Sequence, residues 1–307
     1  MAGIHPDHIA DTDAPAALGP RLIALIRAAR GALARHRTPL TIIFAALFCA
    51  GVAYSAGRLE LAVSDLGFVY IAILALIVIP ASMLYGAVNF MIMAHGAGVS
   101  VPFSRSFKVS CVAAFAEFLP IPGGALVRGG ALMREGTSTL DAGAHVTVNA
   151  LLWIACSAVA ASLALGALVP VALALGIGGV AGVIACTAWL VKRAGPGIAV
   201  AALAMRVIGL GLAGARIITA FLAITITVGF FEIYPFVFAS ILGSAASIAP
   251  GGLGISETVA AAIATLSTIP PEAAFLAVGL NRFIGFVVSG IATGLFAVLS
   301  RKTGAPS

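Results

Sequence analysis

The feature that most constrains this chain is a run of 46 residues, Val146–Val191, that contains no Asp, Glu, Lys or Arg. As a single helix, at about 1.5 Å per residue, it would be more than twice as long as the roughly 30 Å hydrocarbon core of a bilayer. Pro170 and the glycines near it favour a turn, so the run predicts a hairpin of two membrane-spanning helices. Further apolar windows predict four more spans: Thr38–Gly57, Leu66–Ala94, Ile217–Phe231 and roughly Glu272–Ser300.

The composition excludes most other classes of protein. Of the 307 residues, 61% are hydrophobic and only 9% are charged, whereas an ordinary soluble domain is about 45–50% apolar and about 25% charged. This excess of apolar surface excludes a soluble enzyme, a nucleic-acid-binding domain and a disordered chain. The formal net charge of +6 suits lipid headgroups, and no nucleic-acid partner is expected. The four cysteines stand singly in apolar stretches, which predicts neither a disulfide framework nor a metal site.

Two apolar regions are each interrupted by a Pro-Gly-Gly sequence that a continuous helix would not keep. Val109–Arg134 contains Pro122-Gly123-Gly124, and Ile233–Pro271 contains Pro250-Gly251-Gly252. The arms that precede the breaks have 11 and 14 residues, or about 16 and 21 Å of helix, which is too short to cross alone. Broken backbone is tolerated at membrane depth only where protein or a watery cavity satisfies it. The pattern predicts two re-entrant helical hairpins, with a Pro-kinked ordinary span as the alternative for each.

The chain divides into three parts by charge and hydropathy. Residues 1–37 are a basic tail in which an interfacial amphipathic helix begins at Pro20, with a frayed juxtamembrane segment as the alternative. Residues 38–300 form the transmembrane domain, and residues 301–307 form a short tail. The predicted fold class is an all-α polytopic membrane protein with about six transmembrane helices plus two re-entrant hairpins. The hairpins have opposite orientation and are related as a weak inverted repeat.

The positions of the basic residues predict how this domain is oriented. Both tails are placed in the cytoplasm, and Arg58 is then the only basic residue in a loop on the opposite side. A segment that carries Arg206 and Arg216 is predicted to lie along the cytoplasmic surface, ahead of the fifth span. With this layout, the two Pro-Gly-Gly breaks enter from opposite sides and meet near the midplane, as broken helices do in inverted-repeat transporters.

Charged side chains inside the apolar regions are the candidate site residues, because each costs at least about 2.5–3.5 kcal/mol at the bilayer centre and needs a partner or a role. Glu257 and Arg282 are predicted to form one polar centre that serves the substrate, with a purely structural ion pair as the alternative. Glu117 and Arg128 face each other across the first hairpin, where they either line the site or neutralise each other. Asn281 either contacts the ligand or bonds a neighbouring helix.

The same residues resemble a known family. The sequence Ser247-Ile248-Ala249-Pro250-Gly251-Gly252-Leu253-Gly254-Ile255-Ser256-Glu257, followed by Leu280-Asn281-Arg282, is similar to the signature of the lysylphosphatidylglycerol synthase transmembrane family, whose members are called flippase-like. Phe118-Leu119-Pro120 through Arg128 matches that family's earlier Pro…Gly…Arg motif more loosely. The resemblance covers roughly residues 40–300. It implies a domain with re-entrant helices that moves lipids or lipid-linked groups between leaflets of a bacterial-type cytoplasmic (inner) membrane.

Two features depart from that family. Its members usually carry an acidic-basic pair on the span after the first motif, where this chain has Asn149, so the polar site is expected to be smaller or differently selective. Full-length synthases that resemble this domain also have a large soluble part that transfers an aminoacyl group from tRNA. These 307 residues do not encode such a part, and synthase activity is not expected.

The motifs favour transport over catalysis. The chain has no H-E-x-x-H, G-x-S-x-G or Walker sequence, so we expect no enzyme activity, no cofactor and no ATP site. Gly251, Gly252 and Gly254 offer backbone N–H groups to a phosphate at a helix N-terminus. The leading hypothesis is therefore a translocase for a lipid with an anionic or zwitterionic headgroup. The alternatives are a membrane enzyme of lipid or glycoconjugate biosynthesis and a non-transporting scaffold for synthesis enzymes; a homo-oligomer is left open.

Overall fold

The computed structural model describes residues 45–118, 122–166, 170–246 and 254–302, and the regular elements in these ranges are all helical. The predicted N-terminal tail with its amphipathic helix lies outside the described residues, as do Gly251 and Gly252. The elements, in chain order, are a helix over 45–58, η1 (Val63–Asp65), α2 (Phe68–Ile73), the π-helical η2 (Leu74–Val78), α3 (Ile79–Gly96), α4 (Phe103–Ala116), α5 (Gly123–Arg134), α6 (Thr139–Leu165), α7 (Pro170–Ala194), α8 (Pro196–Ala223), α9 (Tyr234–Ala246), α10 (Ile255–Ala264) and α11 (Pro271–Lys302).

Five of the described helices are long and apolar enough to cross a membrane. In their apolar windows only 17–33% of the residues are buried inside the protein, and large apolar side chains such as Leu76, Ile177 and Leu295 are exposed. Such a surface is unfavourable in water, at about 25 cal/mol per Å², and is suited to lipid. The fold is that of a multi-pass helical membrane protein. The five spans are Phe68–Gly96, Thr139–Leu165, Pro170–Ala194, Pro196–Ala223 and Pro271–Leu299.

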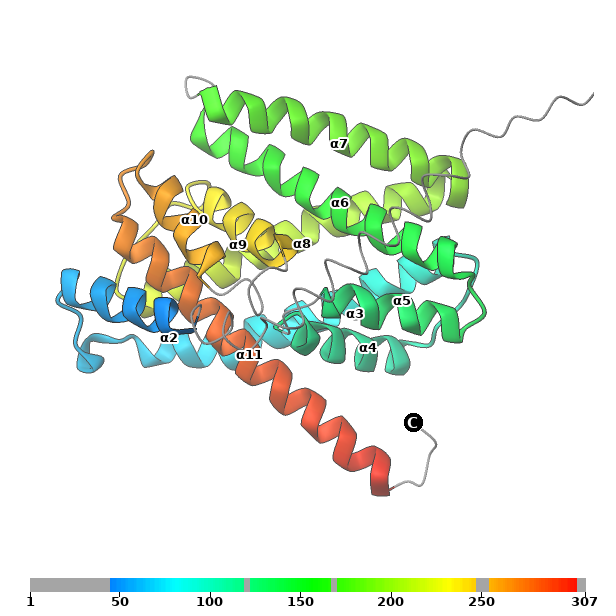
Figure 1. The fold of residues 1–307 in the computed structure, drawn as a ribbon, viewed down its shortest axis with the longest axis horizontal. Helices are drawn as coiled ribbons and strands as arrows, with labels where there is room; N and C mark the ends of the chain where they lie inside the picture. The colour runs from blue at the N-terminus through cyan, green and yellow to red at the C-terminus, as the bar shows by residue number, and fades with distance from the viewer. Residues whose placement is uncertain (1–44, 119–121, 167–169, 247–253, 303–307) are drawn as a thin grey trace, which may run out of the picture. The chain divides into compact units, whose positions relative to one another are not determined.

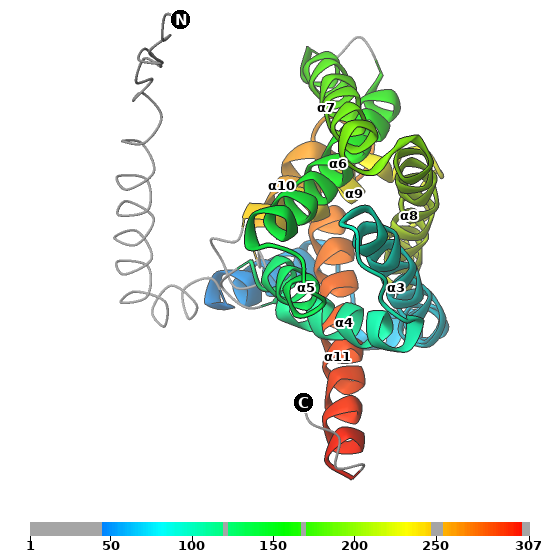
Figure 2. The same ribbon diagram turned by 90° about the vertical axis from the view of Figure 1, so that its right-hand side faces the viewer.

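The long uncharged run forms the two helices expected of it. Helix α6 ends at Gly166, whose φ of +80° is a conformation that glycine adopts without strain, and Pro170 begins α7. The hydroxyl of Ser162 donates a hydrogen bond of 2.6 Å to the carbonyl oxygen of Ala172 on the other helix. Helices α6 and α7 accordingly lie side by side (Figures 1 and 2).

The fifth predicted span is wrong. The sequence predicts a surface segment with Arg206 and Arg216 followed by a span over Ile217–Phe231, but the structure has one continuous helix, α8, over Pro196–Ala223. Pro196 occupies the first turn, where its missing N–H is no loss. A span boundary at each arginine would divide this helix, whereas the fold accommodates both side chains along it. The predicted span over Thr38–Gly57 extends beyond the described residues, of which 45–58 are helical.

The two Pro-Gly-Gly regions each give a pair of short helices instead of one long helix. Helices α4 and α5 are antiparallel neighbours (Figures 1 and 2), and an ion pair between Arg105 and Glu135 joins their far ends. Near the break, a Cβ atom at Gly123 would collide with the carbonyl oxygen of Ala116, so the helices approach as closely as they do because residue 123 is glycine. Helices α9 and α10 also pack on each other, through Gly243 of α9.

Contacts between helix ends show which of them lie together. His145, near the start of α6, is within 3.0 Å of the carbonyl oxygen of Gly96 at the end of α3. Arg193, at the end of α7, lies 3.9 Å from Asp141 in the first turn of α6. We call this side of the structure the Asp141 end. It gathers the end of α3, the start of α6 and the end of α7, which is followed directly by the start of α8.

A second set of contacts defines the opposite side. The N–H of Gly67, just before α2, donates to the carbonyl oxygen of Ala223 at the end of α8 at 2.9 Å. Arg58, nine residues before Gly67, lies 3.6 Å from Glu272 at the start of α11. We call this side the Glu272 end. Helix α8 therefore runs from the Asp141 end to the Glu272 end, and the span formed by α2, η2 and α3 runs in the reverse direction.

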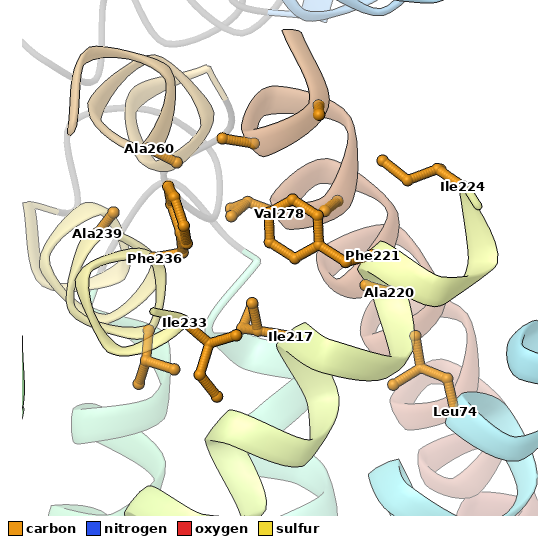
Figure 3. Packing of buried hydrophobic residues seen from close by; sticks show 14 of the residues in the cluster. Leu74, Ile217, Ala220, Phe221, Ile224, Ile233, Phe236, Ala239, Ala260 and Val278 are labelled. Atoms are coloured by element: carbon orange, nitrogen blue, oxygen red, sulfur yellow. The ribbon is translucent and has the colours of Figure 1, made fainter. Parts of the chain in front are cut away.

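The largest buried cluster joins α8, α9, α10 and α11 (Figure 3). Phe221 of α8 and Phe236 of α9 meet edge to face, with ring centroids 5.4 Å apart. Ile217 of α8 and Val278 of α11 are also wholly or almost wholly buried in this cluster. Because the cluster fixes α8 against α11, it sets the relative positions of Arg216 and Arg282, which lie one residue from Ile217 and four from Val278.

Candidate functional site

A cavity of about 490 Å³ lies among helices α3, α4, α5, α6, α8, α9 and α11. This volume is within the range of about 300–1,000 Å³ that is usual for small-ligand sites. The walls combine apolar groups, such as the rings of Phe118 and Trp153, with serine hydroxyls, asparagine amides and charged side chains. Because helices from both halves of the chain contribute, the cavity exists only in the folded protein.

The charge of the cavity is predominantly positive. Four of the charged side chains on its described wall are arginines, and the fifth is Glu117. Even when Glu257, which lies behind Arg282, is included, four guanidinium groups face two carboxylates. Electrostatic attraction is several-fold stronger at a partly buried site than in bulk water, so this wall favours an anionic ligand. The arginines are Arg128, Arg206, Arg216 and Arg282.

The structure brings Glu257 and Arg282 together, with Oε1 and Nε 3.8 Å apart. Glu257 is 0% exposed and lies behind the described wall of the cavity, whereas Arg282 forms part of that wall. Arg282 also donates through Nη1 to the hydroxyl of Ser256, and its guanidinium lies 6.0 Å from the ring centroid of Phe118. Glu257 is thus placed to orient Arg282, and Arg282 is the member of the pair that a ligand in the cavity would meet.

The position of Glu257 follows from the start of α10. Its Oε2 accepts a hydrogen bond of 2.8 Å from the N–H of Gly254, which satisfies one of the free donors at that helix terminus. Gly254 has a φ of +81°, a left-handed conformation that favours glycine. The predicted phosphate contacts of Gly251 and Gly252 fall outside the described residues, so only Gly254 of that predicted set is placed.

Asn281 connects α11 to α8. Its Oδ1 accepts a hydrogen bond of 2.9 Å from Nε of Arg216, and its side chain is only 4% exposed. Within the ranges the structure describes, Arg216 has no carboxylate partner at ion-pair distance. Asn281 therefore bonds a neighbouring helix, one of its two predicted roles, and it also lines the cavity.

Glu117 and Arg128 form the more exposed part of the charged wall. Nη2 of Arg128 donates to Oε1 of Glu117 at 3.0 Å, and the two side chains are 27% and 44% exposed, respectively. Gly124 makes room for this pair, because a Cβ at that position would lie 2.7 Å from Oε1 of Glu117. The two predicted residues thus both line the cavity and neutralise each other.

Arg206 was not among the predicted site residues, yet it is among the most enclosed charges of the cavity, at 3% exposed. It donates to the hydroxyl of Tyr85 at 3.3 Å and to Oδ1 of Asn89 at 3.0 Å, both on α3. A further hydrogen bond goes to Oδ1 of Asn149 on α6, and its guanidinium lies 5.5 Å from the ring centroid of Trp153. We call Arg206 and these four partners the Arg206 cluster.

One signal in the sequence points to the two arginines that the prediction missed. The chain has three asparagines and no glutamine. Asn89 and Asn149 accept hydrogen bonds from Arg206, and Asn281 accepts one from Arg216. All of the carboxamide side chains in the chain thus serve these two arginines. In this chain, the asparagines inside the apolar stretches mark where the two arginines are bound.

No family model, curated protein or solved structure matches this chain in the comparisons. Within the described part of the chain, no group of three or more His, Cys, Asp and Glu side chains is placed to hold a metal ion. The class of protein therefore rests on the fold and the site. It is a multi-pass helical membrane protein with an arginine-rich cavity among its helices.

Proposed function

We propose that this protein is a translocase that moves a lipid or lipid-linked molecule with an anionic headgroup between membrane leaflets. The observation that carries the proposal is the cavity of about 490 Å³, lined by four arginines and enclosed by helices whose outer faces are apolar. The headgroup would enter the cavity while its acyl chains stay in the surrounding lipid. The guanidinium of Arg282 would bind a phosphate oxygen pair, because its planar fork matches that geometry.

The family resemblance supports the same proposal. Ser256, Glu257 and Arg282 belong to the motif that resembles the flippase-like family, and the side chains of Ser256 and Glu257 both contact Arg282. Asn281, the other polar residue of that motif, lines the cavity beside them. We therefore propose membership of the lysylphosphatidylglycerol synthase transmembrane family. Motif residues that are far apart in the sequence meet in one site. This favours a function shared with that family over a chance match of the sequence.

We further propose that the helix pairs α4–α5 and α9–α10 are re-entrant hairpins that enter from opposite sides. The open end of α4–α5 precedes α6 by a short loop and so lies near the Asp141 end. The open end of α9–α10 follows α8 and leads into α11, near the Glu272 end. Basic residues are more frequent in the loops at the Asp141 end, and by the positive-inside rule this excess supports a cytoplasmic Asp141 end. The membrane would be a bacterial-type inner membrane, with both termini cytoplasmic.

The proposal is tested by reconstituting the protein in liposomes that contain a fluorescent lipid and adding dithionite, which quenches only the outer leaflet. We expect the protein to expose inner-leaflet phosphatidylglycerol to quenching faster than protein-free liposomes do. Arg282→Lys should lower this rate although the charge is kept, since a single ammonium cannot bind a phosphate bidentately. Arg282→Ala should lower it further.

The matched control for these variants is Arg193→Gln, which removes an exposed arginine at the Asp141 end, outside the cavity. It should transport at the wild-type rate. If wild-type protein that binds lipid moves none of the anionic, zwitterionic or lipid-linked cargoes tried, the translocase proposal is wrong and a scaffold is favoured. Full transport by the double variant Glu257→Gln with Arg282→Gln would exclude substrate contact by this pair.

A further inference from the structure

The Arg206 cluster holds a buried cation without an acidic partner. Arg206 is 3% exposed, and the structure places no carboxylate within ion-pair distance of it in the ranges that are described. Its hydrogen-bond partners are two amide oxygens and one phenol, which are all neutral. Burying a charge without a counter-charge is costly. In a membrane protein, such a residue marks a functional site by default.

The guanidinium also has unused hydrogen-bonding capacity. An arginine has five N–H donors, and the structure assigns three of them to protein acceptors. Nε is buried and donates to no acceptor in the described part of the chain. Because Arg206, Tyr85, Asn89, Asn149 and Trp153 all line the cavity, a ligand there reaches this cluster without first unfolding any element. An anion in the cavity supplies the missing negative charge.

The cluster is distinct from the centre formed by Arg216, Asn281 and Arg282. Arg206 and Arg216 are ten residues apart on α8, which separates them by about 15 Å along the helix axis. The two side chains are also held by different helices: Arg206 bonds residues of α3 and α6, and Arg216 bonds Asn281 of α11. Arg206 is nearer to the Asp141 end, and Arg216 is nearer to the Glu272 end. The cavity therefore offers two cationic positions at different depths.

We propose that the Arg206 cluster is a second anion-binding site, at which the phosphate of an anionic lipid headgroup binds on its way along the cavity. The description of the ligand as a transported lipid rests on the proposed function, whereas anion binding by Arg206 does not. Two arginine sites of similar chemistry, about 15 Å apart along α8, let a headgroup pass from one to the other. Neither site then has to bind so tightly that it prevents release.

Trp153 gives a direct readout of this site, because it packs against Arg206 and the chain has only one other tryptophan, Trp189. In a Trp189→Phe background, the fluorescence of purified protein is recorded in detergent during three titrations. The probes are inorganic phosphate, phosphatidylglycerol in mixed micelles and, as the zwitterionic control, phosphatidylcholine in the same micelles. We expect a saturable change in Trp153 emission with phosphatidylglycerol and none with phosphatidylcholine.

Asn149→Asp is the most informative variant. It changes the side-chain volume very little but places a permanent carboxylate against Arg206. This carboxylate takes the place of the negative charge of the ligand. The melting temperature should stay the same or rise, and the saturable response should be lost. Arg206→Gln should also lose it, and Arg193→Gln should respond as the parent protein does. If Arg206 had only a structural role, Arg206→Gln would change the melting temperature, and the Trp153 emission of the parent protein would not respond to anions.

The outcomes separate the two proposals. A response to phosphatidylglycerol that Asn149→Asp abolishes supports the second site with a lipid ligand. A response to inorganic phosphate alone, abolished by the same variant, supports the site with a free anion as its ligand. No response to either probe, an equal response to phosphatidylcholine, or an unchanged response in Asn149→Asp overturns the proposal. Binding without transport contradicts only the translocase. Normal transport by a non-binding Asn149→Asp leaves anion binding by Arg206 in place and overturns the passage of the headgroup through this site.

Discussion

At the scale of single residues, the cavity shows how a largely apolar protein keeps charged side chains in its interior. Arg128 and Arg282 each have a carboxylate partner, Glu117 and Glu257, respectively. Arg206 and Arg216 rely on amide oxygens instead. A neutral acceptor satisfies a donor without cancelling its charge, so the second pair remains available to an anion from outside the protein.

Glu257 should matter more for stability than for direct contact with a ligand. Glu257→Ala leaves Arg282 without its buried partner and the N–H of Gly254 without an acceptor, and we expect the free energy of unfolding to fall by about 3–5 kcal/mol. Glu257→Gln keeps an acceptor for Gly254 and should lose less. The measurement is chemical unfolding in detergent micelles, followed by tryptophan fluorescence. Equal stability of Glu257→Ala and the wild type would mean that this pair is not a structural support.

At the scale of helices, close approach through glycine decides how the short helices pack. Gly243 of α9 lies directly against the backbone of Ser256, so that a Cβ would come 2.7 Å from its N and Cα atoms. This contact sets the position of Ser256, which in turn accepts from Arg282. A small residue on α9 therefore controls the placement of a cation on α11.

Gly243→Ala should push α9 and α10 apart. Overpacking of this kind costs typically about 1–3 kcal/mol, and it should lower the melting temperature in detergent and weaken lipid transport through the displacement of Ser256. Gly178→Ala on α7 is the matched control, since a Cβ there meets no atom within 4 Å. It should be neutral or stabilise by up to about 1 kcal/mol, because alanine favours a helix over glycine. Similar melting temperatures for the two variants would contradict close packing at Gly243.

At the scale of the whole molecule, the direction of each helix follows from which ends meet. The Asp141 end collects Arg105, Arg134, Glu135 and Arg193 near the start of α6, and the Glu272 end collects Arg58 and the end of α8. A hairpin at α4–α5 keeps Arg105 and Arg134 on the same side of the membrane. A single Pro-kinked span over the same residues would place them on opposite sides.

Single cysteines in a cysteine-free background test this arrangement. The native thiols Cys49, Cys111, Cys156 and Cys186 are first replaced by alanine. An impermeant maleimide added to intact cells should label a cysteine at position 58 and should label cysteines at positions 105, 134 and 193 only after the cells are opened. The three exposed side chains at the Asp141 end make the comparison direct. Labelling of positions 105 and 134 from opposite sides would show that the first broken region crosses the membrane.

The sequence by itself determined the class of fold, because the requirement for apolar length acts on each segment separately. The 46-residue uncharged run predicts the α6–α7 hairpin with its turn near Pro170. The predicted spans over Leu66–Ala94 and Glu272–Ser300 match the span formed by α2, η2 and α3 and the span formed by α11 to within a few residues. The Pro-Gly-Gly breaks were also readable, since a proline and two glycines end a helix wherever it lies. Glu257, Arg282, Glu117 and Arg128 were found as charges inside apolar windows.

The tertiary structure alone decided where α8 lies and what its arginines do. Tyr85 and Asn149, which bond Arg206, are 121 and 57 residues away in the chain, and Asn281, which bonds Arg216, is 65 residues away. The free-energy cost of an arginine at membrane depth depends on partners that only folding brings together. Hydropathy along the chain overestimates this cost, and it therefore divides α8 at its arginines. The same long-range contacts created the cavity, whose charge no single segment of the sequence carries.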